Sequence, residues 1–306
     1  MGTVLLSQVV NGQNSGFSTI VLSYCPSHER SINVMGQMSV DPRLVPDRER
    51  PGSWYVRISG TDQSYIDPYD PMYLEFDYVQ RIATTINSVF EPGERITAVH
   101  VGGGGMTIPR YIAYTRPTSG QIVFEPDASL TQAVRDVAPL PKNSGIKVRA
   151  TDGRTGMAEI RDDYADLVVV DAFAGACVPP ELGTTEWFGE VRRVLRPDGI
   201  LAMNITDSGS LEYARRVSAG VREHFTPVVV GSDPATWKGR RFGNMVISAG
   251  TRVDPDELVR EAARGVFPHR VVYGLELDRW IGDFRPFTGD DCQSSVPPPG
   301  FLTAFF

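Results

Sequence analysis

Three acidic residues follow segments that read as β-strands, and their side chains are the best placed in this sequence to do chemistry. Glu125, Asp152 and Asp171 each stand at the end of such a segment. Ligands of open α/β sheets bind where the parallel strands end, so carboxylates there could accept hydrogen bonds from ribose hydroxyls or take a proton from a nucleophile. Each residue could instead only cap the helix that follows it. Because all three occur in phase, the sequence favours a nucleoside site.

A run of four glycines, residues 102–105, precedes these carboxylates and joins a strand-like segment to a helix-like one. Glycine has no Cβ, so such a loop turns tightly and lets a ligand approach the backbone. No Gly-Lys-Ser/Thr follows the run, which excludes a Walker-type phosphate site. The spacing of the dinucleotide fingerprint is absent as well. We therefore expect Gly102, Gly103 and Gly104 to bind a nucleoside.

The elements that must position these residues alternate between strand and helix. A hairpin is expected over residues 53–66, and apolar residues recur at helical spacing over residues 74–90. From residue 96 to residue 248 strands alternate with helical segments, which indicates a doubly wound α/β sheet. This order resembles the Rossmann-like fold of class I S-adenosylmethionine-dependent methyltransferases, which has a seven-stranded sheet.

The chain divides into four parts by composition and pattern. Residues 1–50 form an N-terminal extension with short strands and a charged, proline-punctuated linker, and residues 51–91 form a small β-hairpin region with a connecting helix. Residues 92–250 form the nucleoside-binding Rossmann-like domain, and residues 251–306 form a C-terminal helix and tail. The length of 306 residues fits one large domain with a small appendage.

Composition narrows the class of protein. The net charge of −7 argues against nucleic acid as the main partner, because phosphate binding needs a basic face. No apolar run approaches the roughly 20 residues that span a bilayer, and the first residues lack the pattern of a secretory signal. Three separated cysteines suggest reduced thiols, and four histidines show no metal spacing. We expect a cytoplasmic protein without a metal site or a tightly bound cofactor.

Several segments together resemble spermidine synthase and its relatives, over about residues 54–247. They are Gln63, residues 74–78 (Leu-Glu-Phe-Asp-Tyr), Gly102 to Gly104, residues 125–127 (Glu-Pro-Asp), Asp152-Gly153, residues 170–173 (Val-Asp-Ala-Phe), Pro179, Leu182 and residues 184–188 (Thr-Thr-Glu-Trp-Phe). The resemblance implies a small N-terminal β-domain before the methyltransferase-like domain. It also implies a homodimer that transfers an aminopropyl group from decarboxylated S-adenosylmethionine to a diamine such as putrescine.

The resemblance also implies roles for single residues. Asp171 matches the aspartate at the reaction centre, where a carboxylate could take the proton that the attacking amine must lose. Tyr78 could orient the attacking nitrogen by a hydrogen bond, or it could be a half-buried helix residue. By the same resemblance Gln63 helps to hold the nucleoside, Glu125 binds the ribose and Asp152 contacts the adenine. The full expected nucleoside-binding set is Gln63, Gly102, Gly103, Gly104, Glu125, Asp152 and Gly153.

Two positions depart from the family pattern. Gly105 stands where the family carries an aspartate that holds the aminopropyl amine, and Ala174 stands where a second aspartate binds the diamine. Three interpretations follow: an aminopropyltransferase with an altered amine acceptor, an S-adenosylmethionine-dependent methyltransferase, or a non-catalytic nucleoside-binding module. The methyltransferase interpretation explains Gly105, because losing an aspartate removes repulsion towards the carboxylate of S-adenosylmethionine.

Overall fold

A computed structural model describes residues 40–298 of the chain. The strands expected before residue 40 lie outside the described residues. Within them a small antiparallel sheet has the order β1-β2-β3, and it comprises β1 (Leu44–Pro46), β2 (Trp54–Ile58) and β3 (Thr61–Ile66). The expected hairpin is therefore confirmed as β2 and β3. Strand β1 lies in the segment whose charge and prolines are typical of a linker.

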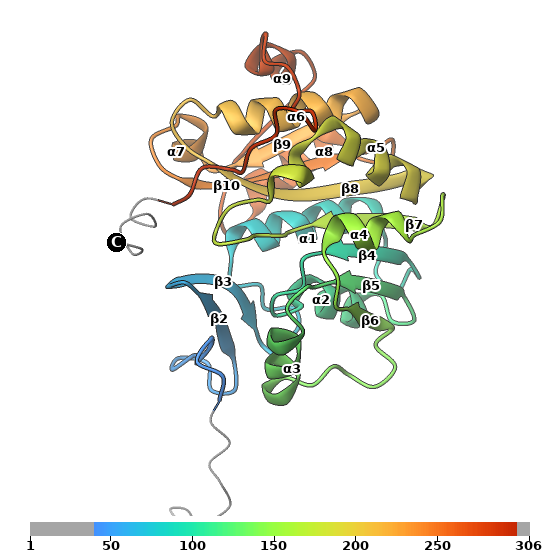
Figure 1. The fold of residues 1–306 in the computed structure, drawn as a ribbon, viewed down its shortest axis with the longest axis vertical. Helices are drawn as coiled ribbons and strands as arrows, with labels where there is room; N and C mark the ends of the chain where they lie inside the picture. The colour runs from blue at the N-terminus through green and yellow to red at the C-terminus, as the bar shows by residue number, and fades with distance from the viewer. Residues whose placement is uncertain (1–39, 299–306) are drawn as a thin grey trace, which may run out of the picture. The chain divides into compact units, whose positions relative to one another are not determined.

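The second sheet is large and mixed (Figure 1). Its strands are β4 (Thr97–Val101), β5 (Gly120–Phe124), β6 (Ile146–Arg149), β7 (Ala165–Val170), β8 (Leu195–Asp207), β9 (Val228–Ser232), β10 (Gly243–Ala249) and β11 (Arg270–Tyr273). They lie in the order β11-β9-β10-β8-β7-β4-β5-β6. Strands β4 to β8 pair in parallel, whereas β10 runs antiparallel to both β8 and β9.

This topology confirms the methyltransferase-like α/β fold, but the expected number of strands is wrong. The large sheet has eight strands among residues 40–298, since β11 pairs antiparallel with β9 at the edge. Strand β11 comes from the segment expected to be helix and tail. It is only four residues long and lies directly between two helices, so its alternation is too brief to stand out in the sequence.

Helices cover both faces of the large sheet (Figure 1). They are α1 (Asp77–Val89), α2 (Thr107–Thr115), α3 (Ala128–Val137), α4 (Gly153–Ala158), the 3₁₀ helix η1 (Pro180–Gly183), α5 (Thr185–Val194), α6 (Glu212–His224), α7 (Pro234–Trp237), α8 (Pro255–Arg264) and α9 (Gly274–Ile281). One face packs against α4, α5, α6 and α9, and the other against α1, α2 and α8. None of these helices combines the length and apolar character needed to cross a membrane.

Alternating side chains of the central strands fill both cores. Val99 and Val101 of β4 point into the core on the α5 side, while Ala98 points into the core on the α1 side. Because a strand sends successive side chains to opposite faces, a sheet covered on both sides needs an apolar residue at nearly every position. This explains why β4, β5 and β7 are mostly apolar, while the two buried polar side chains among them, His100 and Gln121, hydrogen-bond to each other.

The small sheet has a core of its own. Leu44, Val56 and Ile66 pack against Leu130 and Val134 of α3. Helix α3 therefore packs part of its apolar face against the small sheet. This helix begins just after β5. This contact brings β3 next to the glycine-rich loop that follows β4.

Candidate functional site

A cavity of about 300 Å³ lies at the carboxyl ends of β4, β5, β6 and β7. Strand β3 and the start of α1 form part of its wall, so both sheets contribute to it. Every residue that the sequence suggests for the site lines this cavity: Gln63, Tyr78, Gly102, Gly103, Gly104, Glu125, Asp152, Gly153 and Asp171. The carboxylates that end three neighbouring strands are thus brought together with the glycine-rich loop.

The glycine-rich loop passes very close to the backbone at Asp171, directly after β7. Gly102 has a φ of +97°, and a Cβ added to it would lie 2.2 Å from the carbonyl oxygen of Asp171. A Cβ on Gly103 would lie 2.8 Å from the Cβ of Glu125. Glycine is therefore required at both positions, by the backbone conformation at Gly102 and by close approach at both.

Glu125 fixes this loop through its carboxylate. One oxygen, Oε2, accepts hydrogen bonds from the backbone N–H groups of Gly103 and Gly104, each 3.0 Å long. The other oxygen, Oε1, accepts the N–H of Asp127 at 3.0 Å. The residue is 8% exposed and lines the cavity. Because an ionised carboxylate has about four acceptor positions, Glu125 can hold the loop and still accept a hydrogen bond from a ligand hydroxyl.

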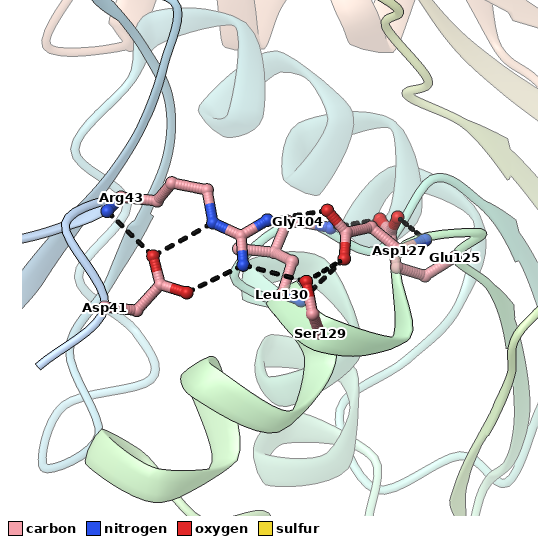
Figure 2. Close-up of polar contacts among 7 residues, drawn as sticks. All are labelled: Asp41, Arg43, Gly104, Glu125, Asp127, Ser129 and Leu130. Carbon is pink, nitrogen blue, oxygen red and sulfur yellow. Dashed lines mark hydrogen bonds and ion pairs between the residues drawn. The ribbon is translucent and has the colours of Figure 1, made fainter.

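A cluster of polar side chains connects Glu125 to the small sheet, and Figure 2 shows it. Arg43, one residue before β1, donates to Asp127 Oδ2 at 2.6 Å and to Ser129 Oγ at 3.0 Å. Asp41 holds the same guanidinium with both carboxylate oxygens, at 2.9 and 2.7 Å. Asp127 also caps α3 by accepting the N–H of Leu130. The cluster ties the β5–α3 turn, which carries Glu125, to the small sheet.

Asp152 and Gly153 lie at the end of β6, where Asp152 caps the short helix α4. The Oδ1 atom of Asp152 accepts the N–H of Thr155 at 2.9 Å, and this bond is the main reason why the pKa of Asp152 is lowered. A Cβ on Gly153 would lie 2.3 Å from Cγ1 of Val101. Asp152 is exposed, so its capping role is compatible with contact to a ligand at the cavity wall.

Asp171 has a different environment at the end of β7. Asn204 of β8 donates its side-chain N–H to Asp171 Oδ1 at 2.9 Å. Asp171 is partly exposed where it lines the cavity, but protein surrounds its carboxyl group closely. Burial raises the pKa of Asp171 to about 6, against the smaller opposing effects of the hydrogen bond from Asn204 and of the nearby Tyr78 hydroxyl. At neutral pH this carboxyl is mostly ionised and can accept a proton, which is the property of a general base.

Tyr78, in the first turn of α1, connects Asp171 to the small sheet. Its hydroxyl donates to the backbone oxygen of Gln63 at 3.3 Å, and its ring stacks on Phe76 with centroids 5.9 Å apart. Burial raises the pKa of Tyr78 well above its usual value, and the nearby Asp171 carboxylate acts in the same direction. Tyr78 therefore stays protonated, with its proton donated to the Gln63 oxygen and its lone pairs available to accept a hydrogen bond beside Asp171.

The two departures from the family pattern lie in different surroundings. Ala174 lines the cavity together with its neighbour Phe173. At Gly105 an added Cβ would lie 2.5 Å from Cγ1 of Ile66, a side chain that is 1% exposed. The loop has no room for a side chain at position 105, because β3 already fills that space.

Sequence reasoning missed four polar residues near the cavity: Arg43, Ser64, Asn204 and Thr107. Asn204 had a signal, since it is a lone polar residue within the apolar run of β8 and is 0% exposed. Arg43 had none, because its partners Asp127 and Ser129 are more than eighty positions away. Among residues 40–298, no group of three or more His, Cys, Asp or Glu side chains could hold a metal ion.

Comparison with known proteins shows likeness to proteins named as a polyamine aminopropyltransferase and a probable spermidine synthase. The chain is 28% identical over 150 residues to a polyamine aminopropyltransferase of Vibrio vulnificus, covering 48% of this chain and 48% of that protein. The match therefore spans about half the length of this relative. A crystal structure of a probable spermidine synthase from Corynebacterium glutamicum is 28% identical with a TM-score of 0.73, covering 84% of this chain and 95% of that one.

A third comparison concerns the fold alone. The structure of human methyltransferase-like protein 13 in complex with SAH has a TM-score of 0.51 and 19% identity, over 70% of this chain and 96% of that one. It agrees with the methyltransferase-like topology of the large sheet. No protein-family model matches the chain.

Proposed function

We propose that the chain is a spermidine synthase-like transferase that acts on an amine. In this proposal an aminopropyl group passes from decarboxylated S-adenosylmethionine to a small-molecule amine acceptor. The observation that carries the proposal is Asp171, a closely surrounded carboxyl with a pKa raised to about 6, at the end of β7 in a cavity that also holds the glycine-rich loop.

The proposed reaction is a displacement at the carbon next to the sulfonium of the donor. The lone pair of the acceptor nitrogen forms the new C–N bond, the C–S bond breaks, and its electron pair stays on sulfur, which leaves neutral methylthioadenosine. The nitrogen loses one proton, and the carboxylate of Asp171 accepts it. The hydroxyl oxygen of Tyr78 accepts an N–H of the acceptor amine, which helps to orient the nitrogen and leaves its lone pair free to attack, and Asn204 holds the carboxylate in place.

The charge of the cavity supports a cationic donor and a cationic acceptor. The described residues that line it include five carboxylates but no Lys or Arg: Glu125, Asp127, Asp152, Asp171 and Glu181. A sulfonium and a protonated amine are both attracted to such a wall. We propose that Glu125 binds the ribose, that Asp152 contacts the adenine, and that Gln63, Gly153 and the glycine-rich loop complete the nucleoside site.

The acceptor is left open by this proposal. Ala174 and Phe173 supply no charge to the wall beside Asp171, so an acceptor with a second ammonium group has fewer partners here than two aspartates would provide. Putrescine is therefore one member of a panel of amines to test, alongside monoamines of similar length.

Methyl transfer from S-adenosylmethionine is the second candidate. The observation in its favour is Gly105, whose position has no room for a carboxylate that would repel the carboxylate of that donor. A methyltransferase would leave the same nucleoside residues in use and change only the group transferred.

The experiment offers the purified chain each donor in turn, with the panel of amines, and identifies the product by its mass. We expect a product that has gained an aminopropyl group, together with release of methylthioadenosine. Gain of a methyl group would replace the proposal with the second candidate. Binding of donor without transfer to any amine would instead identify a non-catalytic nucleoside-binding module. Asp171→Asn serves as the control that removes the base without removing the cavity.

Assembly and location are further proposals that rest on family resemblance and cysteine content. We propose a cytoplasmic homodimer, without nucleic acid or membrane as partner. Light scattering at micromolar protein concentration tests the assembly, and a strict monomer would contradict it.

A further inference from the structure

Two hydroxyl groups face each other on the wall of the cavity next to the glycine-rich loop. Ser64 lies on β3, Thr107 is the first residue of α2, and both line the cavity. Their oxygens are 3.1 Å apart, so they form a hydrogen bond. The pair therefore joins the small sheet to the large-sheet domain at the loop.

The partners of Thr107 decide which way this hydrogen bond runs. The hydroxyl of Thr107 donates to the backbone oxygen of Tyr65 at 2.6 Å, and a carbonyl oxygen can only accept. Since a hydroxyl has a single proton, Thr107 must be the acceptor from Ser64. Ser64 has then also used its proton. The pair is left with free lone pairs and no free donor, so it offers the cavity acceptors only.

The loop itself cannot supply a charged acceptor at this place. A Cβ on Gly105 would lie 2.5 Å from Cγ1 of Ile66 and 2.9 Å from the hydroxyl oxygen of Ser64. A Cβ on Gly104 would lie 3.3 Å from the Cβ of Ser64. The side chains of β3 fill the space that a loop side chain would need, and the polar atom that they bring there is the hydroxyl of Ser64.

We propose that Ser64 and Thr107 bind the ammonium group at the end of the donor's aminopropyl chain. This inference rests on the proposed function and names two specificity-determining residues for it. An ammonium has three donors and no acceptor, so it matches a pair that offers only acceptors. A carboxylate needs donors, and both protons of the pair are already used.

The electrostatic surroundings are consistent with a cation at this place. The start of α2 carries a partial positive charge that opposes it. The carboxylate of Glu125 accepts the N–H groups of Gly103 and Gly104 in the same loop, and so it places a full negative charge nearby. That charge exceeds the partial charge of the helix terminus, which is about half an elementary charge.

Calorimetry with two ligands tests the proposal, because methylthioadenosine lacks the ammonium that decarboxylated S-adenosylmethionine carries. The variants are Ser64→Ala and Thr107→Val, with Thr107→Ser as the version that keeps the hydroxyl. Thr61→Val removes a hydroxyl from β3 away from the cavity and serves as the matched control. We expect Ser64→Ala and Thr107→Val to weaken binding of the decarboxylated donor by about tenfold, the scale of one hydrogen bond to a charged group.

Affinity for methylthioadenosine should stay within about twofold in all four variants. The two hydroxyl oxygens accept hydrogen bonds from the ammonium group, and methylthioadenosine has no ammonium group. Thr107→Ser should bind the donor like the wild type. Equal weakening of both ligands would overturn the inference in favour of a structural role for the pair. Unchanged donor affinity in Ser64→Ala and Thr107→Val would overturn it as well, while leaving the proposed function intact. Failure of the wild type to bind either ligand would overturn the proposed function itself and the inference with it.

Discussion

The ends of β5 and β7 place the same chemical group in two contrasting environments. Glu125, after β5, has its carboxylate satisfied by three backbone N–H groups, from Gly103, Gly104 and Asp127. Asp171, after β7, receives a hydrogen bond from the side chain of Asn204 and lies near the hydroxyl of Tyr78, and burial raises its pKa to about 6.

The difference shows how one edge of a sheet can carry both a carboxylate that binds the loop and ligand and a carboxylate that takes part in proton transfer. Backbone donors on a tightly turned loop cannot rearrange easily, so the carboxylate of Glu125 keeps one position and is suited to binding. The polar side chains around Asp171 only partly offset its loss of water, so its carboxyl can gain and lose a proton near neutral pH. Environment, more than residue type, separates the two roles.

The largest effect is expected from Asp171→Asn. This change removes the proton acceptor, which contributes chiefly in the transition state, so turnover should fall by roughly 10²–10⁴-fold. Affinity for methylthioadenosine, measured by calorimetry, should hardly change, because Asp171 is not part of the proposed nucleoside contacts. A loss of nucleoside binding as large as the loss of turnover would show that Asp171, like Glu125, serves in binding.

The pH dependence of kcat/KM should report the ionisation of Asp171. Because the carboxylate must be free to accept a proton, the rate should fall about tenfold for each pH unit below the pKa of Asp171, which is about 6. The nearby hydroxyl of Tyr78 lowers this pKa, so Tyr78→Phe should move the acidic limb to higher pH. An acidic limb at unchanged pH in Tyr78→Phe would show that Tyr78 does not affect the pKa of the titrating group.

Glu125→Gln should weaken nucleoside binding without altering the acidic limb. An amide presents only one acceptor oxygen, and its NH₂ group would face backbone N–H donors. We expect a loss of about 1–3 kcal/mol in the binding free energy of methylthioadenosine, from one charged hydrogen bond. A folded variant with unchanged affinity would show that this carboxylate serves only to hold the loop.

Arg43→Met should give the smallest effect. The side chains of Arg43 and Asp127 are 26% and 42% exposed, so their ion pair is partly screened by solvent. Loosening the turn that carries Glu125 should cost about 0.2–1 kcal/mol of nucleoside affinity. Arg57→Met is the matched control, because its ion pair with Asp62 lies on the same small sheet but away from the cavity. Equal effects of both changes would exclude a specific link to Glu125.

The sequence was sufficient to predict the residues that strand topology brings together. Glu125, Asp152 and Asp171 could be assigned to one edge because parallel strands end at the same side of a sheet. The same logic cannot reach Arg43 or Thr107, whose partners depend on how the small sheet packs against the large-sheet domain. Strand β11 was missed for another reason, since four residues are too few to show a period.

Local chemistry at the site was also only partly predictable. That Asp152 caps α4 while lining the cavity means that the helix-capping and ligand-site interpretations are compatible and not alternatives. The raised pKa of Asp171 depends on side chains from α1 and β8 that converge only in the folded chain. The sequence identifies a carboxylate, but its neighbours decide whether that carboxylate titrates near neutral pH.

The contact between Gly105 and Ile66 has a consequence for how such proteins diverge. The two positions are 39 residues apart in the chain, yet they share a single volume, since a Cβ at one would lie 2.5 Å from Cγ1 of the other. Substitutions there should covary: a homologue with a side chain at the loop position should carry a smaller residue at the strand position. A change of donor specificity through this loop would therefore need two mutations. The loop mutation alone would overpack the contact, and the strand mutation alone would leave a cavity.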